Sequence, residues 1–600
     1  MSGDISFDLT SLRRAYADGS LTPVQIVEEA LRRADDPEFP HVWIEKVSRE
    51  KLLVLARALP AQPAPDLPLY GVPFAIKDNI DLAGINTTVG CPAFAYAPEK
   101  SATVVEKLIA AGALPIGKTN LDQFATGLVG TRSPYGACRS VFEPRYISGG
   151  SSSGSAVAVA AGMVTFALGT DTAGSGRVPA AFNNLIGCKP TRGLLSNRGV
   201  FPACRSLDCV SIFAGSCHDA QAVLDVAAGF DAADPNSRTR PKNRPGFIGN
   251  FRFGILPRGQ REFFGDAGAA ELYEQAIARL QRCGGEAVEI DFTPFAQAAA
   301  LLYAGPWVAE RRWALGDFFE LHGDGMHPVV REIIGGAKKY DAVATFDAQY
   351  QLQTLAQAAA PTWQQVDLLL LPTTGTTYRL DEVLADPVKL NSNLGYYTNF
   401  VNLFDLSALA LPAGFRPSGG LPFGVTLVAP AFADQALLQL GAKFHLAGAG
   451  NLGATAVKIS DQPLPLEKNE GVLLAVVGAH LRGQPLNHQL TSRHARFVRQ
   501  ARTSPYYRLY ALANTQPPKP GLRRIAEKLG SGIAIEVWAL DAAAFGSFVA
   551  EIPPPLGIGA LELEDGSRMP GFICEPVGLE GARDISEFGG WLAYRESLVR

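Results

Sequence analysis

Two loops rich in serine and glycine constrain this chain more than any other feature. The first loop covers residues 149–155 (GGSSSGS), and the second covers residues 169–176 (GTDTAGSG). The apolar residues 156–168 between them predict a helix that follows the first loop and a buried strand that leads into the second. Small residues let backbone N–H groups approach a reacting atom closely, and N–H groups gathered on such a loop can hold an oxyanion. The serines of both loops are therefore candidate nucleophiles.

A serine hydroxyl becomes a nucleophile only when a base accepts its proton, and the usual partner is a histidine supported by an aspartate. The first half of the chain has only His41 and His218, and neither lies in a recognisable loop motif. Lys77 is a better candidate because it follows the apolar residues Val-Pro-Phe-Ala-Ile. Burial of this segment would disfavour the ammonium form, lower the pKa of the lysine and make it a usable base.

A nucleotide-binding loop is a competing interpretation of one glycine-rich segment. Residues 112–119 match the pattern Gly-x-x-x-x-Gly-Lys-Thr of a P-loop. However, a P-loop follows a strand, whereas Gly112 ends an apparent helix, and Pro115 has no N–H group to offer a phosphate. We therefore interpret residues 114–117 as a short strand and do not expect nucleotide binding.

Lys77 and the two serine loops together resemble the amidase signature family, which uses a Ser–Ser–Lys triad. The resemblance implies that Ser175 is the nucleophile, that Ser151 is the bridging serine and that Lys77 is the terminal base. It also implies a cis peptide bond before Ser151. Ser175 lies 24 residues after Ser151 and 98 residues after Lys77, in keeping with the family. Alone, a Ser/Gly loop is more often a linker and a lysine after a strand more often lies at the surface, but the combination favours catalysis.

The resemblance also implies an oxyanion hole and a fold. The backbone N–H groups of Thr172, Ala173, Gly174 and Ser175 match the family's oxyanion hole, although many members have glycine where this chain has Ala173. The turn-rich loop around Gly127 matches a region that lines the substrate pocket in the family, while a plain surface loop would fit the sequence equally well. The implied fold is α/β, with a central mixed sheet covered by helices.

Residues 301–312 (LLYAGPWVAERR) are more specific, because they resemble the allophanate hydrolases within this family. In those enzymes a tyrosine and an arginine eight positions apart hold the carboxylate of the substrate, which implies this role for Tyr303 and Arg311. Allophanate is a small anion, H₂N–CO–NH–COO⁻, and a planar guanidinium can pair with its carboxylate through two hydrogen bonds. The alternative is a surface helix with a solvated pair of arginines. The resemblance implies hydrolysis of allophanate to ammonia and N-carboxycarbamate without a cofactor.

The composition changes between residues 447 and 468, where glycine, alanine, proline and charged residues show little periodicity. We therefore predict an amidase domain at residues 1–450, a linker at 451–468 and a second domain at 469–600. The second domain resembles the C-terminal domain of allophanate hydrolases, which implies a smaller α+β fold similar to γ-glutamylcyclotransferase.

His480 and His488 are candidate acids in this second domain, because histidine titrates near neutral pH. His480 lies in the sequence Val-Gly-Ala-His-Leu, which matches the small-ligand loop of that fold. In some relatives this domain is implicated in the loss of carbon dioxide from N-carboxycarbamate. A folded interaction domain with two solvated histidines is equally compatible with the sequence.

Composition limits the partners. The net charge is −4 with no long basic block, which argues against nucleic acid, and residues 156–168, the longest apolar run, are too short to span a bilayer. The eight cysteines show no zinc spacing, so we expect no metal and free thiols in a reducing cytosol. The start of the chain lacks a secretory signal pattern. We therefore expect a cytoplasmic enzyme that acts on a small molecule and binds no membrane.

The family suggests a homodimer and a functional link to a biotin-dependent urea carboxylase. A general amidase or a glutamyl-tRNA amidotransferase A-type subunit is the alternative among enzymes, although that subunit lacks the C-terminal region. A catalytically inactive amidase-like scaffold is the alternative outside enzymes, and the intact set of Lys77, Ser151 and Ser175 argues against it.

Short sequence motifs also predict where two helices begin. Thr22, with Pro23 and Gln25 after it, predicts a capped helix start. Ser101 is predicted to cap the amphipathic segment that ends near Gly112.

Overall fold

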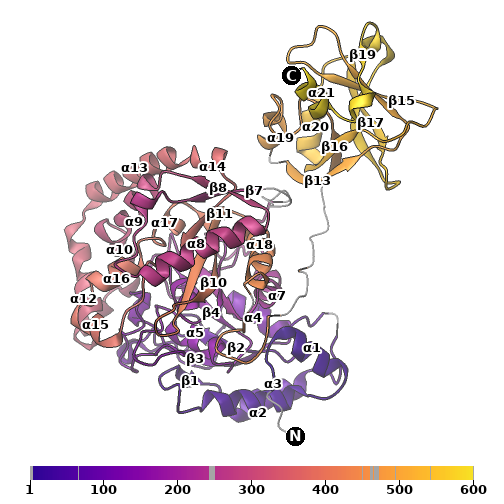
Figure 1. Cartoon of the computed structure of the whole chain (residues 1–600). Coiled ribbons are helices and arrows are strands. Elements are labelled where there is room, and N and C mark those ends of the chain that lie inside the picture. The colour runs from indigo at the N-terminus through magenta and orange to yellow at the C-terminus, as the bar shows by residue number, and fades with distance from the viewer. Residues whose placement is uncertain are drawn as a thin grey trace. The chain divides into compact units, whose positions relative to one another are not determined.

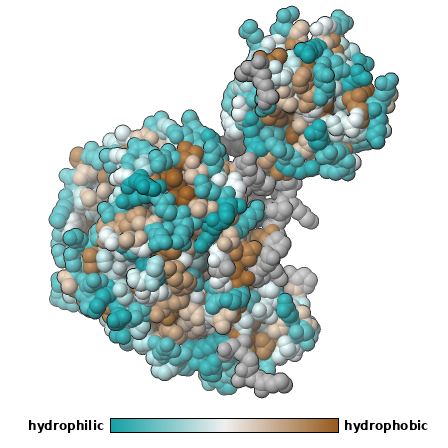
Figure 2. Space-filling view, viewed as in Figure 1, coloured by the Kyte–Doolittle hydropathy of each residue, from teal (hydrophilic) through white to brown (hydrophobic). Residues whose placement is uncertain are grey.

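The computed structural model describes residues 5–64, 66–241, 251–448, 450–459, 464, 472–493, 495–540 and 542–598 of the 600-residue chain. The chain divides into two compact units (Figure 1). The first comprises Met1–Arg240 and Asn250–Leu464, and the second comprises Pro465–Arg600 together with Pro241–Gly249. None of the helices in the described ranges combines the length and the apolar character that a membrane crossing needs. Hydrophilic residues cover much of the face shown in Figure 2, with hydrophobic ones scattered among them.

A mixed sheet of eleven strands forms the centre of the first unit, as the α/β prediction requires. Its strands are β1 (Trp43–Lys46), β2 (Pro73–Lys77), β3 (Leu114–Thr119), β4 (Phe166–Asp171), β5 (Ile186–Lys189), β6 (Cys209–Ala214), β7 (Phe251–Ile255), β8 (Gly285–Glu289), β9 (Leu368–Pro372), β10 (Leu406–Phe415) and β11 (Pro422–Pro430). They are ordered β1-β3-β2-β4-β6-β5-β10-β11-β9-β7-β8. Strand β2 runs parallel to β3 and β4, and β7 runs parallel to β8 and β9, whereas the other neighbours are antiparallel.

Helices surround this sheet (Figure 1). They are α1 (Leu9–Ala17), α2 (Pro23–Ala34), α3 (Arg49–Ala58), α4 (Thr103–Ala110), α5 (Ser153–Ala160), α6 (Val178–Phe182), α7 (Cys217–Ala227), α8 (Ala267–Arg282), α9 (Thr293–Ala304), α10 (Val308–Leu315), α11 (Phe318–His322), α12 (Pro328–Gly335), α13 (Ala342–Ala359), α14 (Thr362–Gln365), α15 (Leu380–Ala385), α16 (Lys389–Leu394), α17 (Phe400–Leu403) and α18 (Asp434–Leu446).

Two helix starts test the local predictions. Thr22 and Gln25 form a capping box at the start of α2, as predicted. The prediction for Ser101 is wrong, because Ala102 occupies the N-cap position of α4 and makes no side-chain cap bond. The Ser101 hydroxyl instead accepts a hydrogen bond from the backbone N–H of Ala83 at 3.0 Å, so tertiary structure uses the residue differently.

The parallel pairing of β2 and β4 brings the two predicted catalytic regions together. Phe74 pairs with Phe166 in the strand register, and their rings stack with centroids 5.1 Å apart. Both strands are fully buried and point in the same direction, so their carboxyl ends meet at one edge of the sheet. The first serine loop leads into α5, whose Ser155 hydroxyl donates to the carbonyl of Leu168 in β4 at 2.9 Å. Both serine loops therefore lie at the carboxyl edge of these strands.

The first unit continues past residue 450, where we predicted its end. The backbone N–H of Ala454 donates to the carbonyl of Ala160 in α5, and Asn184 donates to the carbonyls of Asn451 and Gly453. Residues 460–463 and 465–468 of the predicted linker lie outside the described residues.

The second unit is a smaller α+β body. Its larger sheet has the order β13-β16-β12-β18-β17, and its smaller sheet has the order β15-β14-β19. The strands are β12 (Val472–Val476), β13 (Arg496–Arg502), β14 (Tyr507–Ala511), β15 (Pro520–Arg524), β16 (Ala534–Leu540), β17 (Leu556–Glu562), β18 (Arg568–Cys574) and β19 (Arg583–Asp584), and the helices are α19 (His488–Thr491), α20 (Ala542–Ala550) and α21 (Trp591–Ser597). Its own apolar core includes Leu474, Val537 and Trp591. The similarity to γ-glutamylcyclotransferase stays a prediction.

Candidate active site

The P-loop-like segment forms strand β3, as the sequence interpretation expected. Its lysine, Lys118, is fully buried and donates to the hydroxyl of Thr87 at 2.9 Å. The Lys118 ammonium also lies 3.2 Å from a carboxylate oxygen of Asp78, which is equally buried. A lysine held inside the protein by these two groups is not placed to contact a nucleotide phosphate.

Lys77, at the end of β2, is fully buried and reaches the first serine loop. Its Nζ donates to the Ser151 hydroxyl at 2.8 Å and to the Thr170 hydroxyl, also at 2.8 Å. The peptide bond between Gly150 and Ser151 is cis, as the family resemblance implies. The structure therefore joins Lys77 to Ser151 directly, and Thr170 of β4 fixes the direction of the lysine.

Burial lowers the pKa of Lys77 from its ordinary value of 10.5 to about 7. The carboxylates of Asp122, Asp208 and Asp171 act in the opposite direction, because a nearby negative charge favours the ammonium form. The positive charge of Arg311 adds to the lowering of this pKa. With a pKa near 7, both the ammonium and the neutral amine are populated at neutral pH, which suits a group that accepts and returns a proton.

Ser175 lies in the second serine loop and is almost fully buried, with 3% of its surface exposed. Its hydroxyl lies 3.5 Å from the backbone carbonyl of Gly127, which belongs to the predicted pocket loop. The structure therefore brings Gly127 next to the predicted nucleophile.

A buried ion pair holds the second serine loop in place. Arg177 and Asp171, both fully buried, form two parallel hydrogen bonds of 2.9 Å. The same carboxylate accepts the backbone N–H groups of Gly174 and Gly176, each at 3.0 Å. Arg177 also donates to the carbonyl of Thr398. Because both charges are paired and hydrogen-bonded, they give the loop a defined shape without leaving an unpaired charge.

The hydrogen bonds of the Asp171 carboxylate change which backbone N–H groups are available for the oxyanion hole. The N–H of Gly174 is engaged by a carboxylate oxygen of Asp171, so it is not a free donor as we predicted. In the part of the chain that the structure describes, the N–H groups of Thr172, Ala173 and Ser175 donate to no protein group. These three amides are therefore the available donors. The sequence could not reveal the difference, because it depends on how the Asp171 side chain folds back onto its own loop.

Tyr303 and Arg311 lie on two separate helices, α9 and α10, instead of one continuous surface helix. Arg311 is buried, with 4% exposure, and its Nη1 lies 3.3 Å from the Thr126 hydroxyl and 3.5 Å from the Ala125 carbonyl. Its sequence neighbour Arg312 instead pairs with a half-exposed glutamate. Burial raises the pKa of Tyr303, while the positive charge of Arg311 opposes that rise, so the two side chains lie within electrostatic reach. The solvated pair of arginines considered above is therefore excluded for Arg311.

The backbone at residues 125–127 connects Arg311 with Ser175, the predicted nucleophile. Arg311 contacts Ala125 and Thr126, and the carbonyl of the next residue, Gly127, faces the Ser175 hydroxyl. Two of the predicted substrate-binding residues, Arg311 and Gly127, thus meet at one short segment beside Ser175, and Tyr303 is linked to it through the charge of Arg311.

Sequence reasoning missed a further buried arginine beside residues 125–127, Arg132. It is 1% exposed and donates to the carbonyls of Thr126 at 2.9 Å and Pro387 at 2.6 Å. Its backbone N–H and that of Gly130 donate to the buried carboxylate of Asp122. An arginine in a turn-rich loop has the pattern of a surface residue, so the local sequence gives no signal of its burial.

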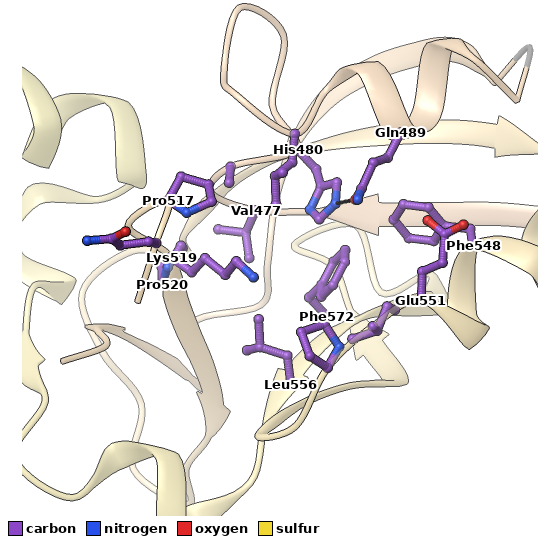
Figure 3. A pocket seen from close by; sticks show the side chains of 15 residues that line it. Val477, His480, Gln489, Pro517, Lys519, Pro520, Phe548, Glu551, Leu556 and Phe572 are labelled. Atoms are coloured by element: carbon purple, nitrogen blue, oxygen red, sulfur yellow. Dashed lines mark hydrogen bonds between the residues drawn. The ribbon is translucent and has the colours of Figure 1, made fainter. Parts of the chain in front are cut away.

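The second unit contains a cavity of about 240 Å³ around His480 (Figure 3). The imidazole stacks on Phe572 with ring centroids 4.9 Å apart and meets Phe548 edge-on at 5.2 Å. Its Nε2 lies 2.9 Å from the side-chain oxygen of Gln489. Lys519 also lines the cavity and extends toward these rings in Figure 3. Burial lowers the pKa of His480, so its neutral form predominates at neutral pH.

His488 lies at the start of α19, is exposed, and has its Nδ1 2.9 Å from the carbonyl of Pro485. It is not among the residues that line the cavity. The structure therefore places His480, but not His488, on the lining of this cavity.

Two family models match the chain. Residues 25–438 match the Amidase family, and residues 472–596 match the allophanate hydrolase C-terminal domain. The urea amidolyase of Lachancea kluyveri is 46% identical over 580 residues, which are 94% of this chain and 32% of that protein. This chain therefore spans about a third of the length of that relative.

Two further relatives match over most of their own length. The solved structure of Kluyveromyces lactis allophanate hydrolase is 43% identical, with a TM-score of 0.77, over 98% of this chain and 99% of that one. The A-type subunit of the glutamyl-tRNA(Gln) amidotransferase from Symbiobacterium thermophilum is 35% identical over 72% of this chain and 94% of its own. Since the family model covers more than half of the residues and carries the buried Lys77–Ser151 contact and the Ser175 loop, the chain belongs to the amidase family.

Proposed function

We propose that this protein hydrolyses allophanate at its terminal amide, with Ser175 as nucleophile and with Ser151 and Lys77 as the proton relay. Neutral Lys77 accepts a proton from Ser151 as Ser151 accepts one from Ser175. The Ser175 oxygen attacks the terminal ureido carbonyl, and the N–H groups of Thr172, Ala173 and Ser175 hold the oxyanion. The relay returns the proton to the leaving nitrogen, and ammonia departs.

The remaining acyl group is an ester of Ser175 with the composition Ser–O–CO–NH–COO⁻. Water, deprotonated through the same relay, attacks this carbonyl, and the ester bond breaks. The products of the two steps are ammonia and N-carboxycarbamate, with one water consumed. Every step is a proton transfer or an acyl transfer, so the chemistry requires no cofactor.

The observation that carries the proposal is the burial of Arg311 next to the nucleophile. A buried cation is costly unless an anion or polar groups compensate it, and among the described residues this guanidinium donates only two long hydrogen bonds, both from Nη1. A substrate carboxylate would fit the remaining donors, and Tyr303, which lies within electrostatic reach of Arg311, would contribute its hydroxyl. A substrate needs an anionic group for Arg311 and an acyl group for Ser175. A molecule with a carboxylate at one end and an amide at the other meets both requirements.

The test measures ammonia release from allophanate and from a neutral amide of similar size. Ser175→Ala should abolish release from both. Arg311→Leu should raise KM for allophanate about 100-fold while it changes the neutral amide less than about threefold, because a lost charge-assisted pair costs roughly 2–3 kcal/mol. Arg312→Leu is the matched control, since Arg312 adjoins Arg311 but faces a surface glutamate, and it should change neither substrate.

Equal losses on both substrates would remove the carboxylate role from Arg311. Hydrolysis of neutral amides without any turnover of allophanate would leave the general amidase as the better function. The match to the glutamyl-tRNA(Gln) amidotransferase covers 72% of this chain and leaves the rest without an account.

We propose further that the cavity around His480 takes N-carboxycarbamate and promotes its loss of carbon dioxide. The cavity combines a lysine, Lys519, which can attract a carboxylate, with a buried neutral histidine, which can exchange a proton. An enzyme that carboxylates urea must supply the substrate, which supports the expected link to a biotin-dependent urea carboxylase. The homodimer and the cytoplasmic location stay predictions.

A further inference from the structure

The buried carboxylate of Asp208 contacts the second serine loop from outside it. Asp208 lies directly before β6 and is 5% exposed. It accepts the backbone N–H of Ala203 at 2.8 Å and that of Cys204 at 3.1 Å. It also accepts a short hydrogen bond from the hydroxyl of Thr172, which precedes it by 36 residues. Three donors thus converge on one carboxylate, and only Thr172 belongs to the catalytic loop.

The Thr172 hydroxyl can control the direction of a catalytic amide. Threonine has a stiff χ1 because two heavy atoms branch from its Cβ, so a hydrogen bond that fixes the hydroxyl also fixes the backbone to which it is attached. The N–H of Thr172 is one of the three amides available to an oxyanion. A bond to an ionised acceptor is about twice as strong as a neutral one.

A neighbouring contact ties the same two segments together. The side-chain amide of Asn402 donates to the carbonyl of Asp171 and to the carbonyl of Leu207, both at 2.8 Å. These carbonyls belong to the residues directly before Thr172 and Asp208. Asp171 fixes the far side of the loop through Gly174 and Gly176, whereas Asp208 acts on the loop at Thr172. The two carboxylates therefore hold different parts of the loop.

The ionisation state of Asp208 is consistent with its role as a hydrogen-bond acceptor for Thr172. Burial raises its pKa to about 6, while the bonds from Thr172 and from the Cys204 backbone and the positive charge of Arg311 counteract part of that rise. At pH 7 the carboxylate is therefore mostly ionised and acts as an acceptor only. It does not need to exchange a proton with the substrate to exert its effect.

We propose that Asp208 is a positioning residue, which sets the geometry of the oxyanion donors through the hydroxyl of Thr172. The proposal rests on the proposed function, because it assumes that Ser175 and its neighbouring amides carry out the acyl transfer. It assigns a role to a side chain that belongs to neither serine loop.

The test separates kcat from KM for allophanate in the full-length protein. Thr172→Val, which is nearly isosteric, should lower kcat about 10- to 100-fold with KM unchanged, because complete removal of one oxyanion donor costs about 100- to 1000-fold and misplacement costs less. Thr172→Ser keeps the hydroxyl and should retain kcat within about threefold of the wild type. Asp208→Asn combined with Thr172→Val should be no slower than the slower single variant, because both changes break the same contact.

A matched control is the buried pair of Thr191 and Asp434, which has the same chemistry away from the site. The Thr191 hydroxyl donates to Asp434 at 2.8 Å, and Thr191 is 1% exposed. Thr191→Val should lower the melting temperature about as much as Thr172→Val does, but it should leave kcat unchanged.

The outcomes distinguish the two proposals. If the wild type releases ammonia from allophanate, Ser175→Ala does not, and Thr172→Val keeps its kcat, the role of Asp208 is wrong and the hydrolase stands. The role of Asp208 would also be wrong if Thr172→Ser had a kcat as low as that of Thr172→Val, or if the losses of the two single variants multiplied in the double variant. If the wild type does not turn over allophanate, the proposed function itself fails. Thr172→Val leaves the bonds from Ala203 and Cys204 to Asp208 in place, so the test does not depend on the folding of Asp208→Asn.

Discussion

The state of Lys77 determines how the rate of this enzyme should depend on pH. The lysine must be neutral to accept a proton, and burial lowers its pKa to about 7. About half of the molecules would then carry the neutral amine at pH 7 and about a tenth at pH 6, compared with roughly one in 3000 at pH 7 for a lysine with its ordinary pKa. The reaction rate should therefore rise with pH, because a larger fraction of Lys77 is neutral and able to accept a proton as pH rises.

The assay is the rate at which a neutral fluorophosphonate labels Ser175 between about pH 5.5 and 9. This probe carries no carboxylate, so its reaction reports the nucleophile without the binding contribution of Arg311. We expect the rate to rise about tenfold per pH unit below about pH 7 and to level off above it. Ser175→Ala should not be labelled at any pH.

The variant Arg311→Leu tests this assignment because it should change the pKa of Lys77. The positive charge of Arg311 helps to lower the pKa of Lys77, so its removal should raise that pKa and move the midpoint of the labelling curve to higher pH. Arg312→Leu should leave the midpoint where it is. A midpoint above about pH 9 in the wild type, a rate that falls as pH rises, or a shift to lower pH in Arg311→Leu would refute the assignment of Lys77 as the buried base.

Two further predictions concern the buried ion pair and the second unit. Asp171→Asn leaves the Arg177 guanidinium buried without its counter-charge and should lower the free energy of unfolding by about 3–5 kcal/mol, measured by urea denaturation; a loss below about 1 kcal/mol would show that the pair does not hold the loop. His480→Asn should leave ammonia release in the amide step unchanged and let N-carboxycarbamate accumulate, as followed by ¹³C NMR, whereas His488→Asn should behave as the wild type. Identical product ratios in the two histidine variants would remove His480 from the decarboxylation.

The parts of the site that depend on local sequence could be predicted. Lys77 ends an apolar strand, and the two serine loops flank an apolar helix and strand, so short-range pattern was sufficient to single out these segments as candidates, and the family resemblance assigned their roles. The capping box at Thr22 is local in the same sense. The cap at Ser101 failed although its local pattern was also favourable, because the backbone N–H of Ala83 competes for the same hydroxyl. Local preference gives way when a distant group offers a better partner.

Contacts between distant segments could not be predicted. Thr170 directs the Lys77 ammonium from a neighbouring strand, and Arg132 ties its turn-rich loop to the carbonyl of Pro387, a residue far along the chain. The Gly174 amide, predicted as an oxyanion donor, is occupied by a carboxylate only three residues away, but only the folded loop shows which way that side chain turns. The domain boundary at residue 450 was predicted from a change in amino-acid composition. Composition cannot show that the backbone of Ala454 is hydrogen-bonded to α5.

The placement of Tyr303 and Arg311 on α9 and α10 has a consequence for how such enzymes diversify. Of the groups assigned to bond cleavage, Lys77 ends β2 and Ser175 lies in the loop after β4, where a substitution disturbs the proposed chemistry and core packing together. The proposed anion-binding residues, Tyr303 and Arg311, stand on helices outside that sheet, and Arg311 contacts the loop residues Ala125 and Thr126. A lineage can therefore exchange the residues of these helices, and with them the preferred substrate, while it inherits the hydrolytic centre unchanged.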